Sequence, residues 1–169
     1  MIRTVHIPRA LTLALVFSLI LPLLTACGKG REAHDPLAYL QTDMEVSVCG
    51  ELWGIAFSGV LRHDTDGESA LTFTAPAALS GMTVSRSGER DTLTLGQNSY
   101  PLAPSSDHAL FRLLLPLTAG EVISQKEESD GGQCAIIETA DGECYTVRAD
   151  EKGNPLSWES DGMRMEIEG

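Results

Sequence analysis

Four cysteines carry the most reactive side chains in this sequence. Cys27 follows an apolar segment, whereas Cys49, Cys134 and Cys144 lie in the body of the chain. Thiolates bind zinc when pairs of ligands occur at short spacing. The sequence has no Cys-x-x-Cys pair, and no histidine accompanies the cysteines at such a spacing. We therefore expect no metal site.

The three cysteines of the body could instead form a disulfide. A two-residue turn at Asp141-Gly142 would place Cys134 and Cys144 on opposite faces of a hairpin, about 17 Å apart along the strands. They could not then bond, because bonded cysteines have Cα atoms within about 7 Å. Two alternatives stay open: a disulfide of Cys49 with Cys134 or Cys144, which an oxidising compartment would permit, and free half-buried thiols.

Hydrolytic chemistry has only weak support in the sequence. Ser106, Asp107 and His108 have the side-chain types of a catalytic triad, but adjacent residues at a helix start do not converge on one point. Helix capping explains Ser106 and Asp107. The other histidines of the body, His34 and His63, lie in a tether and at a strand end. Because the motifs Gly-x-Ser-x-Gly and His-Glu-x-x-His are absent, we expect no catalytic residue, no enzyme activity and no cofactor.

The acidic segment Asp64 to Glu68 resembles the beginning of a calcium-binding loop. It lacks the third acidic position and the glutamate at position 12 of such a loop. Asp66-Gly67 within it is a hairpin-turn signal. We therefore predict a turn here and no calcium site.

These residues must be positioned by strands, because Asp-Gly turn signals recur between segments of alternating polarity. Leu71 and Phe73 alternate with Thr72 and Thr74, as in an antiparallel strand with one buried face. The expected strands span residues 43–49, 52–63, 68–75, 80–86, 91–95, 121–127, 133–139, 143–149, 155–159 and 163–168. The predicted fold is mainly β with an inserted helix: one antiparallel, strongly curved sheet or open half-barrel of about ten strands.

One apolar segment, residues 109–117, interrupts the strand pattern and predicts a helix in which Arg112 is the only charged residue. A helix this apolar must be covered, and the concave face of the sheet is the place for it. Its stripe either lines a ligand cavity or simply fills the sheet. The predicted cavity residues are Phe73, Leu110, Phe111, Leu114 and Leu117. A shorter helix is expected over 35–41.

Trp53 allows two interpretations. It lies between Gly50 and Gly54, so it could form an exposed apolar tip for contact with a membrane or a partner. We favour the alternative, in which Trp53 belongs to the core, because large aromatic side chains are mostly buried.

The N-terminus has the pattern of an export signal. Arg3 and Arg9 precede an uncharged, leucine-rich stretch over residues 10–26. This stretch ends in Leu24-Thr-Ala-Cys27, which resembles the lipobox of bacterial lipoproteins. The resemblance implies cleavage between Ala26 and Cys27, with a diacylglyceryl lipid on the Cys27 thiol. Two or more acyl chains anchor a protein firmly to a membrane.

The expected organisation is a signal peptide over 1–26, a lipidated cysteine and flexible tether over 27–34, and one β-rich domain over 35–169. We expect an extracytoplasmic protein on the outer face of the cell membrane, or at the outer membrane of a host with two membranes. The formal net charge of −12 argues against binding to nucleic acid. Oligomeric state is not encoded in any recognisable pattern.

A lipoprotein with a curved antiparallel sheet and an inserted apolar helix resembles the lipoprotein-carrier superfamily of the LolA/LolB type. The likeness rests on Leu71-Thr-Phe-Thr-Ala-Pro76, Leu79-Ser-Gly-Met-Thr83 and Thr92-Leu-Thr-Leu-Gly96, followed by the helix at 106–116. The resemblance implies an apolar cavity that binds or carries an acyl lipid or a lipoprotein. The alternative is a non-enzymatic scaffold lipoprotein that binds an envelope protein, because a fold does not by itself specify the task.

Overall fold

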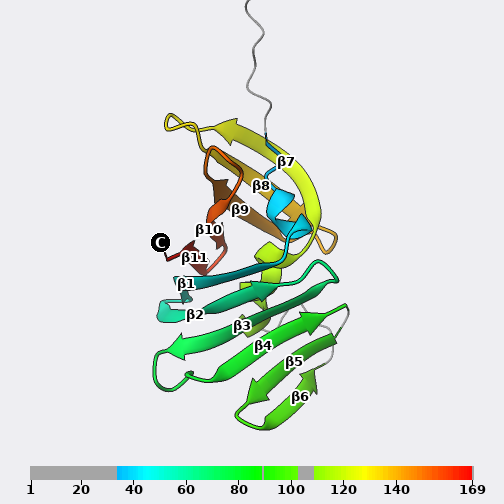
Figure 1. The fold of residues 1–169 in the computed structure, drawn as a ribbon, viewed down its shortest axis with the longest axis vertical. Helices are drawn as coiled ribbons and strands as arrows, with labels where there is room; N and C mark the ends of the chain where they lie inside the picture. The colour runs from blue at the N-terminus through cyan, green and yellow to red at the C-terminus, as the bar shows by residue number, and fades with distance from the viewer. Residues whose placement is uncertain (1–33, 89, 103–108, 169) are drawn as a thin grey trace, which may run out of the picture. The chain divides into compact units, whose positions relative to one another are not determined.

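The computed structural model describes residues 34–88, 90–102 and 109–168. They belong to one compact unit, residues 34–169, built almost entirely from strands (Figure 1). The predicted signal peptide, its predicted cleavage site at Ala26 and the predicted lipid attachment site at Cys27 lie outside the described residues. No helix within the described ranges has the length and apolar character needed to cross a membrane.

The described elements are eleven strands and two short 3₁₀-helices. In chain order they are η1 (Ala38–Gln41), β1 (Met44–Leu52), β2 (Ile55–His63), β3 (Glu68–Ala75), β4 (Met82–Ser87), β5 (Arg90–Leu95), β6 (Asn98–Leu102), η2 (Ala109–Leu117), β7 (Gly120–Glu127), β8 (Gln133–Thr139), β9 (Cys144–Ala149), β10 (Pro155–Ser160) and β11 (Met163–Ile167).

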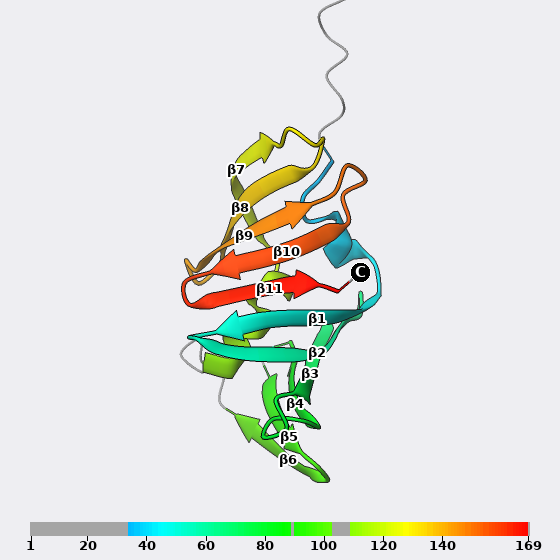
Figure 2. The same ribbon diagram turned by 90° about the vertical axis from the view of Figure 1, so that its left-hand side faces the viewer.

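All strands form one antiparallel sheet with the order β6-β5-β4-β3-β2-β1-β11-β10-β9-β8-β7. The pairing of β1 with β11 joins the first and last strands, so two meanders become one continuous sheet. The sheet does not close, because β6 and β7 lie at its two ends, and it is strongly curved (Figure 2). The predicted open, mainly β fold is confirmed, with β6 as a strand that the sequence pattern did not indicate.

Alternation along the strands places one face of the sheet in the core. Leu61, Leu71 and Val84 are direct cross-strand neighbours and are all fully buried. The opposite face is polar, and there Thr72 and Thr83 join their hydroxyls at 2.9 Å. Since a shift of one residue would reverse the two faces, this alternation fixes the register.

Hairpins form at all four Asp-Gly sequences, but the turn at Asp141-Gly142 is longer than predicted. The Thr139 N–H donates to the Glu143 carbonyl across a three-residue loop, with Gly142 at a φ of +79°. A three-residue loop of this kind needs a left-handed residue at its end, which glycine supplies without strain. The register therefore differs by one residue from that of a two-residue turn.

The apolar segment at Ala109–Leu117 forms the 3₁₀-helix η2. It packs against β3 and β4, and also against β9 and β11. Figure 1 shows it (yellow-green) on the inner side of the curved sheet. Arg112, its one charged residue, forms an ion pair of 3.0 Å with Glu143 in the β8–β9 loop. The predicted covering of the concave face by this helix is therefore observed.

Candidate functional site

The concave face of the sheet is the first candidate, because the predicted cavity residues meet there. Phe73, Phe111, Leu114 and Leu117 are between 1% and 7% exposed and belong to one apolar cluster, against which the partly buried Leu110 packs. Their side chains pack against one another and against the strands. The structure thus brings these residues together in one hydrophobic core.

A buried polar network fixes η2 in this core. The Tyr39 hydroxyl donates to the Pro116 carbonyl at 2.6 Å, and the Trp158 indole N–H reaches the Tyr39 oxygen at 3.3 Å. The Tyr145 hydroxyl donates to the Thr118 carbonyl at 3.2 Å, just after η2. Burial raises the pKa of Tyr39 well above its usual value, and the neighbouring Tyr145 raises it further. These tyrosines therefore remain neutral donors. The sequence pattern gave no indication of them.

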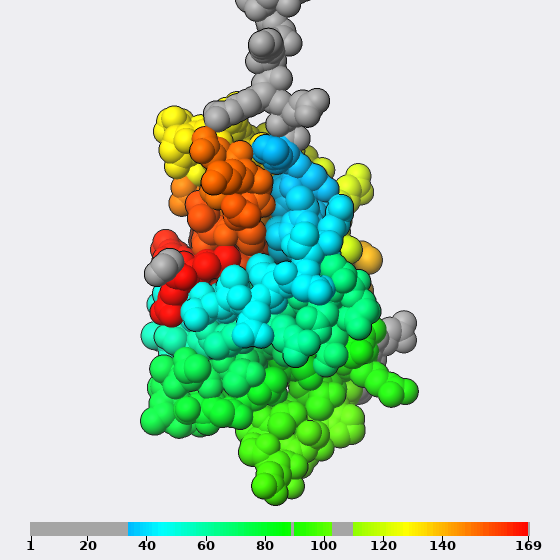
Figure 3. Space-filling model, in the orientation of Figure 1, coloured from blue at the N-terminus to red at the C-terminus, as the bar shows by residue number. Residues whose placement is uncertain are grey.

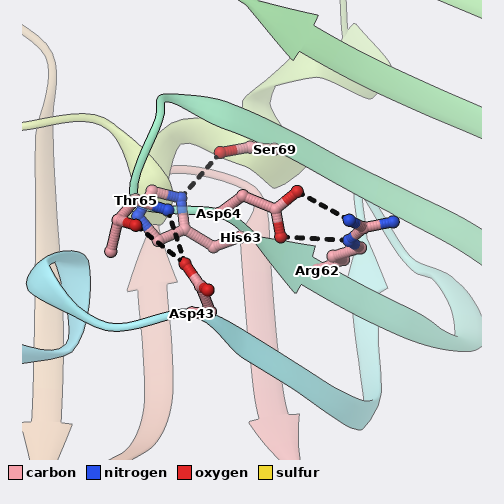
Figure 4. A network of polar contacts seen from close by, with 6 residues as sticks. All are labelled: Asp43, Arg62, His63, Asp64, Thr65 and Ser69. Carbon is pink, nitrogen blue, oxygen red and sulfur yellow. Dashed lines mark hydrogen bonds and ion pairs between the residues drawn. The ribbon is translucent and has the colours of Figure 1, made fainter.

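A second polar cluster surrounds His63, at the end of β2 (Figure 4). The His63 ring contacts the Ser69 hydroxyl at 3.0 Å through Nδ1 and the Leu40 carbonyl at 3.1 Å through Nε2. Both ring nitrogens are thus used to join η1 to the β2–β3 hairpin. His63 is only 6% exposed, so this arrangement is structural in character.

The carboxylates of the same cluster also serve the hairpin. Asp43 accepts the Thr65 N–H at 2.8 Å and the Thr65 hydroxyl at 2.9 Å, and these bonds lower its pKa. Asp64 forms a two-point ion pair with Arg62. Within the described ranges, no group of three or more His, Cys, Asp or Glu side chains is arranged to hold a metal ion.

The other predicted polar candidates are dispersed. His34 lies near Gly153 of the β9–β10 hairpin, and its carbonyl accepts a hydrogen bond from Gln125 of β7 at 3.1 Å. Figure 3 shows the residues around η1 beside that hairpin. Ser106, Asp107 and His108 lie outside the described residues.

The three described cysteines are free thiols on the outer, polar face of the sheet. Strands β11 and β10 separate Cys49 in β1 from β9, and Cys144 also lies four residues along β9 from the level of Cys49, so the two are roughly 19 Å apart. Cys134 in β8 is level with Cys49 but four strands away, which is again roughly 19 Å. The predicted disulfide of Cys49 with Cys134 or Cys144 is therefore wrong, and the alternative of free thiols holds.

Cys134 and Cys144 also differ from their predicted arrangement. Cys144 lies opposite Glu138, which shares a face with Cys134. The two thiols thus lie on the same face, because the loop at Gly142 shifts the register by one residue. They are still four residues apart along the strands, about 13 Å, which is too far for a bond.

Trp53 is not in the core, contrary to the favoured interpretation. Leu52 pairs with Ile55, so Trp53 and Gly54 form the two-residue turn between β1 and β2. The Trp53 side chain is 53% exposed, and Ile55 beside it is 60% exposed. Trp158, in contrast, is fully buried. The sequence had suggested strands ending at residue 49 and starting at 52, which would have made Trp53 a strand residue.

The hollows that described residues form include two on the surface. One, of about 610 Å³, is lined by charged side chains of the β7–β8 hairpin and by Arg148, which forms an ion pair with Glu128 at 2.6 Å. The other, of about 450 Å³, lies at the β10–β11 turn. Its lining residues are Ile136, Cys144, Tyr145, Thr146, Glu159, Ser160, Asp161 and Gly162.

Comparison with known proteins gives similarity only at the level of solved structures. No family profile and no curated protein sequence matches the chain. An uncharacterized conserved protein from Thermus thermophilus matches with a TM-score of 0.49 and 10% identity, covering 78% of each chain. A LolA superfamily protein from Nitrosomonas europaea matches with a TM-score of 0.47 and 11% identity, covering 76% of this chain and 85% of that one.

A third similar structure is that of the CwlD amidase from Clostridioides difficile in complex with the GerS lipoprotein. It matches with a TM-score of 0.43 and 11% identity, covering 95% of this chain and 92% of that one. These TM-scores and identities are low, so no conclusion about function follows from them.

Proposed function

We propose that this protein is a lipid-anchored lipoprotein on the outer face of a membrane, whose sheet domain binds another envelope protein without catalysing a reaction. The observation that carries the proposal is the burial of η2 against the concave face. Phe111 and Leu114 of η2 are 3% and 1% exposed, so these side chains serve the hydrophobic core and are not open to a ligand. We therefore expect the envelope protein to bind at the outer surfaces of the domain.

The anchor in this proposal rests on the sequence. The lipobox resemblance at Leu24 to Cys27 supplies the lipid, and the export pattern supplies the extracytoplasmic location. A tethered domain meets other membrane-associated proteins at a raised effective concentration, so even a modest intrinsic affinity suffices for association.

Native mass spectrometry of residues 28–169, followed by organic extraction, tests the proposal. We expect the mass of the bare polypeptide, unchanged after phospholipids or lipopeptides are offered. In parallel, cross-linking of the full-length protein in its own cells should yield one defined protein adduct. A stable lipid adduct without any protein adduct would contradict the proposal.

Lipid binding is the second candidate, because apolar side chains continue on the core-facing side beyond η2. Leu95 lies opposite the buried Met82, and Tyr100 follows Leu93 opposite the buried Val84. Leu95 is 44% exposed and Tyr100 is 48% exposed. An acyl chain lying on β5 and β6 would cover them.

A substitution distinguishes this second candidate. If lipid binds there, Leu95→Glu should abolish a lipid adduct, whereas Leu156→Glu in β10, at a residue of similar exposure, should not. Equal retention of lipid by both variants would exclude β5 and β6 as the binding site.

A further inference from the structure

We propose that the β1–β2 turn, with Trp53 as its anchor, is the surface that binds a cationic protein partner. This inference rests on the proposed partner-binding function and gives it a location and a chemistry. Its starting point is the contrast between the two tryptophans of the chain. Trp158 is fully buried, whereas the side chain of Trp53, at the tip of a hairpin, is half exposed.

The backbone at Trp53 is held in an unfavourable conformation. Its φ is +48°, and it is the only non-glycine residue with a positive φ in the described part of the chain. Two-residue turns of this kind usually place asparagine or aspartate at that position, because bulky side chains are disfavoured there. Strain of this type is retained where surrounding contacts enforce it, and it is concentrated at functional sites.

Contacts with the neighbouring β10–β11 turn enforce this conformation. The Trp53 N–H donates to the Gly162 carbonyl at 2.7 Å. The Trp53 indole ring lies so close to Gly162 that a methyl group added to that glycine would overlap the Nε1 atom of the indole. Trp53 is therefore exposed and also fixed in position. A preorganised tryptophan loses little entropy on binding, which makes it an effective interface anchor.

The surroundings of Trp53 favour a cationic partner. The adjacent hairpin ends over 51–55, 138–144 and 159–164 contain the carboxylates of Glu51, Glu138, Asp141, Glu159 and Asp161, besides Glu143, which is already paired with Arg112. Arg164 is the one base in these three ranges. It lies directly between Glu51 and Glu159 in the strand pairing and forms an ion pair of 2.6 Å with Glu166, so one positive charge stands against five carboxylates. Such a surface repels an anionic membrane and a second copy of this acidic chain, and it attracts a basic protein.

The hollow of about 450 Å³ extends from the same glycine. Gly162 lines it together with Glu159, Asp161 and the half-exposed Ile136. Its acidic and apolar lining suits the side chain of a lysine or an arginine, whose stem is apolar and whose head is charged. The partner would thus receive Trp53 in an apolar pocket and place a basic side chain in this hollow.

Site-specific photo-cross-linking of the full-length protein in its own cells tests the location. A benzoylphenylalanine at position 53 should give one protein adduct, and the same group at position 156, where leucine is 49% exposed in β10, should not. Adducts of equal yield at both positions, or lipid adducts at position 53, would overturn the inference.

The cross-linked protein, once identified and purified, supplies the second test. Trp53→Ala should weaken its binding about 30-fold or more, as expected for an anchor residue, whereas Leu156→Ala should change the affinity less than twofold. The double variant Glu159→Lys, Asp161→Lys should weaken binding, and affinity should fall as salt is raised. Unchanged binding by Trp53→Ala, or a salt-independent affinity, would refute the inference.

The fluorescence of Trp53 distinguishes binding to a protein from insertion into a membrane. Vesicles of phosphatidylcholine with phosphatidylglycerol should leave the emission of the wild-type protein unchanged, whereas the purified partner should shift it to shorter wavelength. Trp53→Phe should show no shift. A shift with vesicles would overturn the inference in favour of membrane insertion.

The photo-cross-linking experiment distinguishes failure of this inference from failure of the proposed function. If the cross-linker captures a protein at position 156 but not at position 53, only the location is wrong. If it captures no protein at either position, the partner-binding function is wrong as well.

Discussion

At the residue scale, one buried hydroxyl connects three elements of the core. Tyr39 receives the Trp158 N–H and donates to the Pro116 carbonyl, so one hydroxyl links η1, β10 and η2. A buried donor or acceptor that loses its partner costs more than the bond itself contributes. Residues that the sequence pattern did not mark therefore determine how η2 is held.

Tyr39→Phe tests this linkage. The substitution leaves the Pro116 carbonyl and the Trp158 N–H without their partner, so we expect a loss of about 1–3 kcal/mol in the free energy of unfolding. Urea denaturation measures it. Tyr145→Phe, which removes the longer bond of 3.2 Å to Thr118, should cost less. Equal losses in the two variants would contradict the central position of Tyr39.

Asp150 makes stability depend on pH. Its carboxylate accepts hydrogen bonds from the Asn154 side chain and backbone and from the Lys152 N–H, and the Asn154 side chain is the main cause of its lowered pKa. When the pKa of a carboxyl group is lower in the folded state than in the unfolded state, the group stabilises the folded state at any pH above the unfolded-state pKa. This contribution is lost as the pH falls through the folded-state pKa.

We therefore expect Asp150→Asn to lower the melting temperature at neutral pH and to have little effect well below pH 3.8, the usual value for aspartate. Thermal melts of the wild-type and variant proteins from neutral pH to about pH 2 measure the difference between their melting temperatures. A difference that stays constant over this range would show that the charge of Asp150 contributes nothing.

The thiols give a chemical test of the register. In residues 28–169, denatured without reductant, Cys49, Cys134 and Cys144 should all react with a thiol reagent, because the sheet keeps them too far apart to bond. In the folded protein Cys144 should react first, since it is the exposed one. Finding a single reactive thiol would mean that a disulfide forms and that the register is different.

At the scale of elements, loop length decided what the strand pattern left open. The Asp-Gly signals correctly predicted hairpins, but the three-residue loop at Gly142 changed which residues of β8 and β9 face each other. At Gly50, too, the structure differs from the sequence pattern, here in the position of the β1–β2 turn. It lies within β1, where the Arg164 carbonyl approaches too closely for any side chain, so the turn falls at Trp53 instead. Glycine marks both turns and close backbone contacts, and the sequence alone does not distinguish them.

The packing of η2 is testable by truncation. Leu114→Ala should destabilise the domain by about 2–5 kcal/mol, because it leaves a cavity at a side chain that is 1% exposed. Leu156→Ala, at 49% exposure, should cost less than about 0.5 kcal/mol. Chemical denaturation measures both. A small loss in Leu114→Ala would mean that η2 can leave the concave face, as a lipid carrier would require.

At the scale of the whole molecule, an open sheet leaves two edges and a convex face for contact with other molecules. On the concave face, η2 packs against β3, β4, β9 and β11. A lipid anchor on Cys27, as proposed, would confine this sheet to a membrane surface.

The anchor is tested by Cys27→Ser in the full-length protein. The wild-type protein should incorporate radiolabelled fatty acid and enter the detergent phase of a cloud-point extraction, whereas the variant should do neither, because two or more acyl chains are needed for stable anchoring. Partition of both proteins into the detergent phase would show that the apolar segment before Cys27 is retained as the anchor.

The sequence by itself determined the class of fold, the hairpins and the covering of the concave face, because alternation of polarity and burial of apolar side chains are local and repetitive. Only the tertiary structure decided the loop lengths, the positions of the thiols and the exposure of Trp53. The exposure of Trp53 depends partly on the pairing of β1 with β11, which are far apart in the sequence. The positions of Cys134 and Cys144 depend on the length of the loop at Gly142, because one residue of register reverses which face a side chain occupies.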